Sequence, residues 1–284
     1  MIDYINANLI GAASTTRDIN AFDSFRKDDA NRKRILVGQL NQHRSFKAAE
    51  NHRDWFHQHV GKKKEYKCGI CLITEPYIVN NRLKIFDGLE IFQYNGNERI
   101  RACIAISKGI QAWPVLQFTD RDQTVIGFKN NHKTILVSST YMAHPDPDSQ
   151  DEPPPHPPDI FKRLVEYCTI NNFDLIVGSD VNSHSSLWNS TNDNERGDAL
   201  AEYILACNIH VLNEGCKPTF ENAVRKEILD ISMANSHALD LIDNWKVEDR
   251  HTQSDHKLIS FTIDTNIKID LGFRRNIRKT DWRE

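Results

Sequence analysis

Residues able to bind a metal ion or to move a proton stand at the ends of apolar runs that the sequence predicts to be strands. They are Asn41, Glu75, Tyr141, Asp180 with Asn182, Asp230, and Asp255 with His256. Each alone has an ordinary explanation, because an Asn or Asp after a strand is usually a turn residue. Together they offer carboxylates that suit Mg²⁺ and a histidine that suits proton transfer. Strand ends are also where a rigid sheet can present several side chains to one cleft.

The elements that must position these side chains are many strands with a few helices between them. Buried strands are expected at 35–41, 68–74, 173–178, 209–213, 228–233 and 258–263. Shorter runs separated by turn residues, typical of an antiparallel sheet, occupy 83–86, 89–94, 100–106, 124–128 and 133–140. Helices are expected at 45–60, 159–171 and 194–208. This mixture favours an α+β domain in which two sheets pack face to face with helices outside.

One domain accounts for most of the 284 residues. We place it at 35–266, after a polar lead-in at 1–34 and before a basic extension at 267–284. Seven of the ten prolines lie between Pro145 and Pro158, a stiff stretch that follows a predicted strand and precedes a predicted helix. We therefore interpret that stretch as an insertion within the domain.

Composition excludes several classes of protein. A hydrophobic fraction of 39% is too high for a disordered chain, and the sequence shows neither an apolar run long enough for a membrane helix nor a signal peptide. A net charge of −3, from 36 basic and 39 acidic side chains, argues against a protein that coats nucleic acid but allows local contact with it. Six irregularly spaced cysteines indicate reduced intracellular thiols, and Cys68 and Cys71 are expected to pack in the core.

The order of the motifs along the chain is more specific than any single residue. It runs Gln-Leu-Asn41, Thr-Glu75-Pro, Thr-Tyr141, Gly-Ser-Asp180-Val-Asn182, Leu-Asp230-Ile and Ser-Asp255-His256. This order resembles the endonuclease/exonuclease/phosphatase superfamily. The resemblance implies a four-layered αββα sandwich and a metal-dependent phosphoester hydrolase.

A second set of motifs narrows the resemblance. It comprises Gly178-Ser-Asp-Val-Asn-Ser-His184-Ser-Ser-Leu-Trp188-Asn-Ser190, Asn194-Glu-Arg196-Gly197, Leu212-Asn213-Glu-Gly215, Pro218-Thr219-Phe220, Phe118-Thr-Asp120-Arg121-Asp122 and the tail from Arg275 to Trp282. These motifs resemble the endonucleases of arthropod non-LTR (LINE-type) retrotransposons, in polyproteins that continue into a reverse transcriptase. The chain departs from that pattern at Ser179, Ser185 and Asn189, where the family usually has Gly, His and Gly.

The resemblance assigns a role to each residue of the motifs. Glu75, Asn41 and Asp255 would hold Mg²⁺, for which Mn²⁺ could substitute. Asp180 would orient or deprotonate the attacking water, Asn182 would donate to the phosphate, and Tyr141 would contact the phosphate or the leaving oxygen. His256 would face the scissile phosphate while Asp230 accepts its other N–H and fixes its tautomer.

DNA contacts are expected from loops above the sheets. The candidates are Arg44, Arg121, Arg196, Arg225 and His184. For the arginines the alternative is a solvated surface cation, and Arg196 could instead hold its own loop together. For His184 the alternative is a loop histidine bonded to backbone, and Trp188 is expected to be a packing anchor.

The narrower resemblance implies an endonuclease that nicks DNA to prime reverse transcription, acting in the nucleus, with retroelement RNA and a reverse transcriptase as possible partners in a longer polyprotein. Two alternatives stay open from the sequence. One is a phosphomonoesterase or phospholipase of the same superfamily, which would share every metal residue. The other is an inactive remnant that only binds, although no catalytic position lacks a matching residue.

Overall fold

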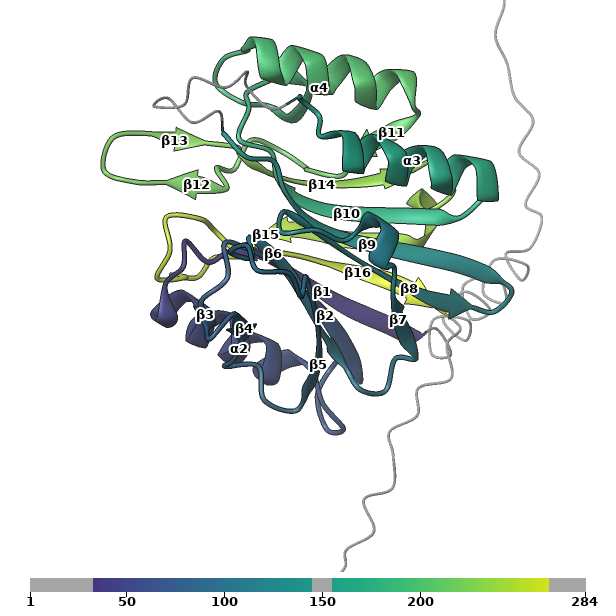
Figure 1. The fold of residues 1–284 in the computed structure, drawn as a ribbon. Coiled ribbons are helices and arrows are strands. Elements are labelled where there is room, and N and C mark those ends of the chain that lie inside the picture. Colours follow the sequence, from purple (N-terminus) through teal and green to yellow (C-terminus); the bar gives the residue numbers. More distant parts are fainter. Residues whose placement is uncertain (1–32, 145–154, 266–284) are drawn as a thin grey trace, which may run out of the picture. The chain divides into compact units, whose positions relative to one another are not determined.

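Two six-stranded sheets form the centre of the computed structural model, which describes residues 33–144 and 155–265 (Figure 1). The first sheet contains β15 (Ile242–Val247), β16 (Ile259–Thr265), β1 (Lys33–Asn41), β2 (Cys68–Thr74), β6 (Ala102–Ser107) and β5 (Leu89–Gln93) in that order. The second contains β11 (Ile209–Val211), β14 (Asp230–Asn235), β10 (Asp174–Asp180), β9 (Lys133–Tyr141), β8 (Gln123–Asn130) and β7 (Ala112–Pro114). Two small hairpins pair β3 (Ile78–Val79) with β4 (Arg82–Leu83), and β12 (Phe220–Glu221) with β13 (Lys226–Glu227).

Each sheet contains one parallel pair of strands whose connection includes a helix. Helix α2 (Phe46–His59) lies between β1 and β2, and α3 (Asp159–Asn171) lies between β9 and β10. Parallel neighbours need such a crossover, and their carboxyl ends then meet at one edge of the sheet. The two parallel pairs therefore determine where the polar strand ends gather.

Local sequence defines where the helices begin and end. The hydroxyl of Ser45 accepts a hydrogen bond from the Ala48 amide at the start of α2, and Asn194 does the same for Gly197 at the start of α4 (Glu195–Ala206). Asn172 ends α3 in the left-handed conformation that Asn tolerates. The short 3₁₀ turns are η1 (Leu116–Phe118), η2 (Ser186–Trp188) and η3 (Leu239–Leu241).

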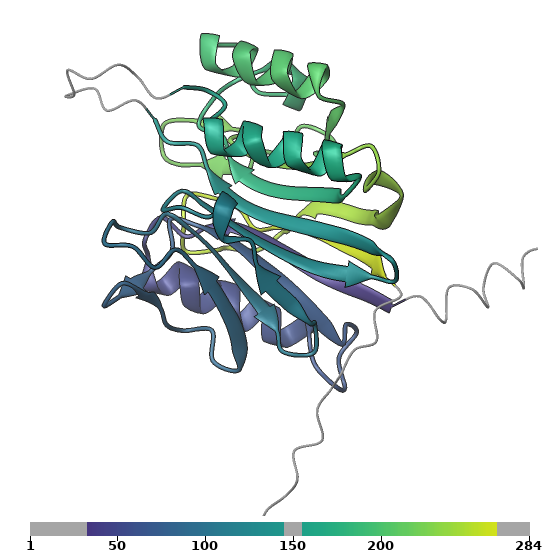
Figure 2. The same cartoon turned by 45° about the vertical axis from the view of Figure 1, so that its right-hand side comes forward.

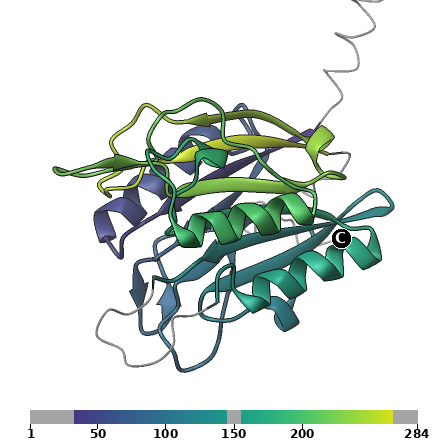
Figure 3. The same cartoon turned by 90° about the horizontal axis from the view of Figure 1, so that it is seen from above.

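The apolar core has three parts, which separate four layers. Val37 of β1 and Val137 of β9 belong to the cluster between the two sheets. On the outer face of the first sheet, Trp55 of α2 packs in a cluster with Leu36 of β1, and on the outer face of the second, α3 and α4 pack against residues such as Val177. Figures 2 and 3 show α3 and α4 side by side on the face away from α2. The predicted αββα sandwich is confirmed.

Some predicted elements are wrong in their bounds. Of the expected strand at 83–86 only Leu83 is in a strand, because residues 84–87 form a turn whose Phe86 side chain packs in the α2 cluster. Strand β1 begins at Lys33, two residues before the expected domain boundary, and β14 begins at Asp230 instead of 228. Strand β15 was not predicted, because Asp243, Asn244 and Lys246 interrupt its apolar pattern at the sheet edge.

The remaining expectations about organisation concern parts of the chain that the structure does not describe. Residues 1–32 of the lead-in, residues 145–154 of the proline-rich stretch, residue 266 and the whole extension at 267–284 lie outside the described residues. In the described part, Cys68 and Cys71 are buried within β2. No helix of that part is long and apolar enough to cross a membrane.

Candidate active site

The first sheet brings Asn41 and Glu75 to one edge. Asn41 ends β1 in register with Thr74, the last residue of β2, and Glu75 follows directly. The backbone of Glu75 has a φ of 40°, a left-handed conformation that a glutamate seldom adopts. Its amide is held by the carbonyl of Arg101 at 2.8 Å. Local strain of this kind collects at functional sites, where the surrounding structure holds it in place.

The second sheet brings Tyr141, Asp180 and Asp230 to its own edge. Asp180 ends β10 opposite Tyr141 of the parallel strand β9 and opposite Asp230, the first residue of the antiparallel strand β14. Asn182 follows in a left-handed conformation, with its amide donating to Asp180 Oδ1 at 3.2 Å and its side chain donating to the Met142 carbonyl at 3.2 Å. These contacts place Asn182 directly beside Asp180.

Asn41 joins the two edges. Its Nδ2 donates to Asp180 Oδ2 at 2.7 Å across the interface between the sheets and lies 3.3 Å from Glu75 Oε2. Two residues earlier in β1, the Gln39 side chain donates to the carbonyls of Ser179 and Ile231 in the second sheet, at 3.3 Å and 3.2 Å. The two sheets are therefore joined by buried polar contacts at and just below the site.

Asp230 and His256 form a buried pair. His256 Nδ1 lies 2.7 Å from Asp230 Oδ2, and both side chains are almost completely buried. Burial alone would lower the pKa of His256, but the Asp230 carboxylate outweighs it and raises that pKa to about 9. The imidazole is therefore protonated at neutral pH in this arrangement. The edge of the Phe220 ring packs against it, with ring centres 5.0 Å apart.

Asp180 has a carboxyl group whose pKa lies close to neutral pH. Burial, followed by the nearby Asp230 carboxylate, raises the pKa of Asp180 to about 7. Tyr141 responds to the same surroundings, because burial and the carboxylates of Glu75 and Asp180 raise the pKa of its phenol to about 12. The site thus concentrates negative charge in a place with little water.

This donor set fits a hard divalent cation. Among the described residues Asp230 Oδ1 is buried without a hydrogen-bond partner, and the oxygens of Glu75, Asp180 and Asn41 are the kind that Mg²⁺ prefers. One ligand atom each from Asp180, Asp230 and His256 also lies within 4.8 Å of the other two. The short bond between His256 and Asp230 suits that pair to proton transfer, so Glu75 is the carboxylate left to hold a cation. Asn41 presents its Nδ2 to Glu75 and accepts from the His43 amide through its Oδ1.

Asp255 is the least integrated member of the predicted metal set. Its side chain is 45% exposed, and its Oδ2 lies 3.9 Å from His43 Nδ1. It lines a cavity of about 560 Å³ together with Ser45, Glu221 and Lys257. Asp255 therefore lies at the entrance of the site, whereas Asp180 and Asp230 lie at its floor.

The predicted DNA-binding cations are less free than expected. Arg44 Nη2 lies 2.8 Å from Glu75 Oε1, so the guanidinium pairs with the predicted metal ligand. Arg196 donates to the Ala143 carbonyl at 2.7 Å and thus holds a loop. Arg121 Nε lies 3.7 Å from Asp122 Oδ1, and Arg121 Nη1 lies 3.8 Å from Glu98 Oε1.

His184 and Arg225 flank the site in different ways. The ring of His184 contacts Ser190 Oγ at 3.0 Å and lies 3.5 Å from Glu227 Oε2, so it bonds to side chains and not to backbone. Arg225 is exposed and lies 5.0 Å from the centre of the Phe220 ring, which itself packs on His256. Trp188 is buried in the α3–α4 cluster, as expected of a packing anchor.

Sequence reasoning missed three residues that hold the site together. Thr219 Oγ1 accepts hydrogen bonds from the amides of Leu229 and Asp230, at 3.0 Å and 2.9 Å. Ser254 Oγ donates to the Asn41 carbonyl at 2.9 Å and accepts from the His256 amide at 3.2 Å. Arg101 is the third, because its carbonyl accepts the hydrogen bond from the Glu75 amide at 2.8 Å. Hydroxyl side chains in loops are common, and the spacing of Thr219 and Ser254 gives no signal of their role. Thr219 does belong to the Pro218-Thr219-Phe220 motif.

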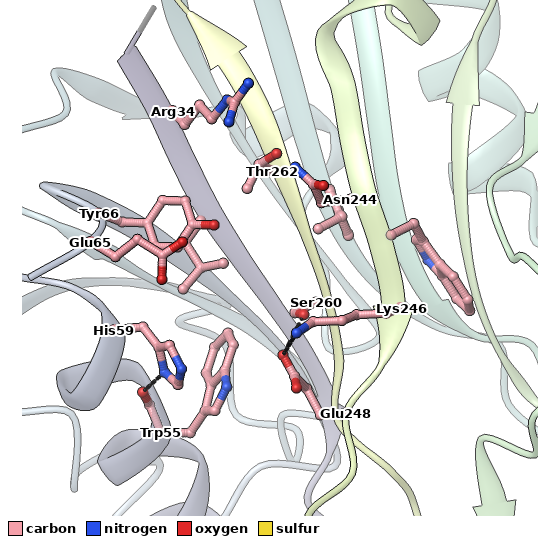
Figure 4. Close-up of a pocket in the computed structure, with 13 residues that line it drawn as sticks. Arg34, Trp55, His59, Glu65, Tyr66, Asn244, Lys246, Glu248, Ser260 and Thr262 are labelled. Atoms are coloured by element: carbon pink, nitrogen blue, oxygen red, sulfur yellow. Dashed lines mark hydrogen bonds and ion pairs between the residues drawn. The ribbon is translucent and has the colours of Figure 1, made fainter. Parts of the chain in front are cut away.

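A second cavity, of about 550 Å³, lies on the outer face of the first sheet. Figure 4 shows Trp55 and His59 of α2 facing Lys246 and Glu248 across it. None of the predicted site residues lines this cavity. The catalytic candidates therefore gather at the sheet edge, away from it.

Comparison with known proteins gives matches to nucleases. A family model described as endonuclease-reverse transcriptase matches residues 135–260. No curated protein matches the chain.

Several solved structures match across most of their length. The endonuclease domain of TRAS1, a telomere-specific non-LTR retrotransposon, is 27% identical to this chain, with a TM-score of 0.64. The match covers 81% of this chain and 98% of that domain. The AP endonuclease LMAP from Leishmania major matches at 12% identity, 90% and 93% coverage and a TM-score of 0.59. The Xenopus laevis APE2 catalytic domain matches at 11% identity, 82% and 95% coverage and a TM-score of 0.60. The chain therefore resembles the endonuclease/exonuclease/phosphatase superfamily and is similar to the endonuclease domain of a non-LTR retrotransposon.

Proposed function

We propose that the protein is a Mg²⁺-dependent endonuclease that hydrolyses phosphodiester bonds of DNA. The observation that carries this proposal is the convergence of Asn41 and Glu75 with Asp180, Asp230 and His256, in which Asn41 bonds across both sheets. These residues provide acidic oxygens on one side and a protonated imidazole on the other. A phosphate would lie between a base and a cation, as hydrolysis requires.

Glu75 and Asn41 would hold the metal ion, with Asp255 at the entrance of the site. A bound Mg²⁺, or Mn²⁺ in its place, would neutralise charge that develops on the phosphate oxygens. Arg44 would then exchange its bond to Glu75 for one to a DNA phosphate. This exchange explains how a predicted DNA-binding cation can lie against a metal ligand in the free protein.

The other catalytic roles would belong to side chains of the protein. Asp180, whose pKa is raised to about 7, is suited to orient and deprotonate the attacking water near neutral pH. His256, held by Asp230, would donate a hydrogen bond to a phosphate oxygen. Asn182 would contact the same phosphate, and Tyr141 would contact the leaving oxygen.

DNA would approach the edge where the strand ends gather. Arg225, which is exposed beside the Phe220 ring, would contact the backbone, and Arg121, Arg196 and His184 would support loops or phosphates around it. Similarity to the endonuclease domain of a non-LTR retrotransposon supports the further proposal that the nick primes reverse transcription in the nucleus. Retroelement RNA and a reverse transcriptase would then be its partners.

Plasmid nicking tests the proposal directly. The purified chain with Mg²⁺ should convert supercoiled plasmid into relaxed circles, and EDTA should abolish the conversion. Glu75→Ala should lower the rate by roughly 10²-fold or more, because the metal position loses its carboxylate.

Glu166→Ala is the matched control, since Glu166 is an exposed glutamate on α3. It should nick like the wild type. The proposal fails if no relaxed circle forms, or if Glu75→Ala is as active as Glu166→Ala. Release of inorganic phosphate from inositol phosphates without nicking would favour the phosphatase alternative instead.

A further inference from the structure

Arg101 lies where the two sheets meet beside the candidate site. It directly precedes β6 of the first sheet, and its carbonyl accepts the hydrogen bond from the Glu75 amide at 2.8 Å. Its own amide donates at 2.6 Å to the carbonyl of Arg121, in the segment that leads into β8 of the second sheet. The backbone of Arg101 therefore contacts both edges that form the site.

The guanidinium of Arg101 is held by Asp122. Nε donates to Asp122 Oδ1, and Nη2 donates to Oδ2 at 2.5 Å. This two-point arrangement fixes the plane of the guanidinium, which a lysine could not reproduce. The Arg101 side chain is only 18% exposed, so the pair is partly shielded from water.

The same guanidinium lies over the ring of Tyr141. Its Cζ is 5.0 Å from the ring centre, within the range in which a cation is attracted to an aromatic face. Asp122 completes the arrangement, because its carbonyl accepts from the Tyr141 amide at 2.7 Å. Among the described residues no hydrogen bond holds the Tyr141 hydroxyl, so the ring orientation depends on what packs against it.

Charge keeps this contact in place. Burial alone would lower the pKa of Arg101, but the hydrogen bonds and charge of Asp122, with smaller contributions from Tyr141 and Glu75, raise it. The guanidinium is thus cationic, paired with the Asp122 carboxylate and close to that of Glu75. An exposed arginine would lose most of this interaction to solvent.

We propose that Arg101 is a positioning residue: held by Asp122, it fixes the ring of Tyr141 so that the phenol points into the site. The consequence for catalysis rests on the proposed endonuclease function, whereas the consequence for the ring does not. Arg101 acts through Tyr141 and needs no contact with DNA. The Glu75 amide is held by the backbone of Arg101, which a side-chain substitution leaves in place.

Fluorine NMR of protein labelled with 3-fluorotyrosine tests the effect on the ring without metal or DNA. Tyr141→Phe identifies the Tyr141 resonance by its disappearance. In Arg101→Lys that resonance should shift and broaden, because the ring samples more than one orientation. Arg53→Lys is the matched control, since Arg53 donates from both Nε and Nη2 to the exposed Asp54 carboxylate. A Tyr141 resonance that is unchanged in Arg101→Lys would overturn the proposal.

A double-mutant cycle tests the effect on rate. Arg101→Lys and Tyr141→Phe should each lower kcat for plasmid nicking by a similar factor, roughly 10²-fold, with little change in KM. The double variant should be no slower than the slower single variant, because both changes remove one function. Multiplied losses would show independent roles and would overturn the inference. If Arg101→Lys does not fold, Asp122→Asn serves the same cycle, with a smaller loss expected.

The two proposals can fail separately. If the wild type does not nick DNA but the fluorine resonance responds to Arg101→Lys, the endonuclease function fails and the positioning role stands. If the wild type nicks DNA and loses activity in Glu75→Ala, but Arg101→Lys behaves like Arg53→Lys in both experiments, only the positioning role fails.

Discussion

Asp180, Asp230 and His256 share one buried space, and the charge of each depends on the other two. The Asp230 carboxylate raises the pKa of Asp180 and of His256, so it favours the protonated form of both. Since the two carboxylates lie opposite each other in adjacent strands, neither can be changed without altering the other. At the scale of single residues, the site is therefore an electrostatic unit.

Asp230→Asn tests this unit. The substitution removes the carboxylate that offsets burial, so the pKa of His256 should fall from about 9 to below its ordinary value of 6.5. His256 would then be neutral at pH 7, and the nicking rate should fall by roughly 10²–10⁴-fold. Proton NMR of the His256 ring across pH measures the first effect, and plasmid nicking measures the second.

Asp240→Asn is the control for this experiment, because Asp240 is exposed in η3. It should change neither quantity. A His256 pKa that stays near 9 in Asp230→Asn would show that another group holds the proton.

At the scale of elements, helix α4 determines the position of the loop that follows Asn182. The Asn194 side chain accepts from the amides of Gly197 and His184, at 2.8 Å and 3.2 Å. Gly197 packs so closely that a Cβ there would lie 1.7 Å from the His184 carbonyl oxygen. The contacts of Asn194 and Gly197 thus give a packing reason for the Asn-x-Arg-Gly motif, which holds the loop after β10.

Gly197→Ala should therefore destabilise the protein and move the loop. We expect a loss of about 1–3 kcal/mol in the free energy of unfolding, as in other overpacked sites. Urea denaturation measures this loss. Glu202→Ala, at an exposed position of the same helix, should lie close to the wild type. Equal stability of the two variants would refute the proposed contact.

At the scale of the whole molecule, the sandwich buries groups that it must keep neutral. His52 of α2 packs in the outer layer against Trp55 and Phe86, with ring centres 6.2 Å and 5.5 Å away. Burial, followed by the charge of Arg250, lowers the pKa of His52 to about 3. Unfolding exposes this ring to water and allows it to bind a proton.

Acid should therefore unfold the protein partly through His52. Its folded pKa lies below the unfolded value of 6.5, so the unfolded state binds more protons below pH 6.5, and stability falls as the pH drops from there toward 3. Between pH 7 and pH 5 this one group should cost about 2 kcal/mol. Urea denaturation at both pH values measures it.

His52→Gln should remove that part of the pH dependence, whereas His57→Gln, at an exposed position of the same helix, should keep it. Identical pH dependence in His52→Gln and in the wild type would contradict the prediction, whatever their stability at pH 7.

Much of the architecture followed from local sequence patterns. The strands ending at Asn41 and Thr74 and the helix at 159–171 could be predicted because apolar runs, helical spacing and capping residues act over a few neighbours. The short strands were harder. The apolar residues Leu83 and Phe86 pack against α2 and not in a sheet, and β15 has a polar pattern because it lies at an edge.

The sequence by itself determined the residue types of the site and their order along the chain, because apolar runs that end in a polar residue form a local pattern. Only the tertiary structure decided which of these residues touch. It placed Asn41 between Glu75 and Asp180, moved Asp255 to the entrance, paired Arg44 with Glu75 and set Arg101 over Tyr141. The reason is physical, because the residues in contact lie far apart in the sequence. Arg44 and Glu75 are 31 positions apart, and Asn41 and Asp180 are 139 positions apart. They form only where two sheets pack, and no local pattern records that packing.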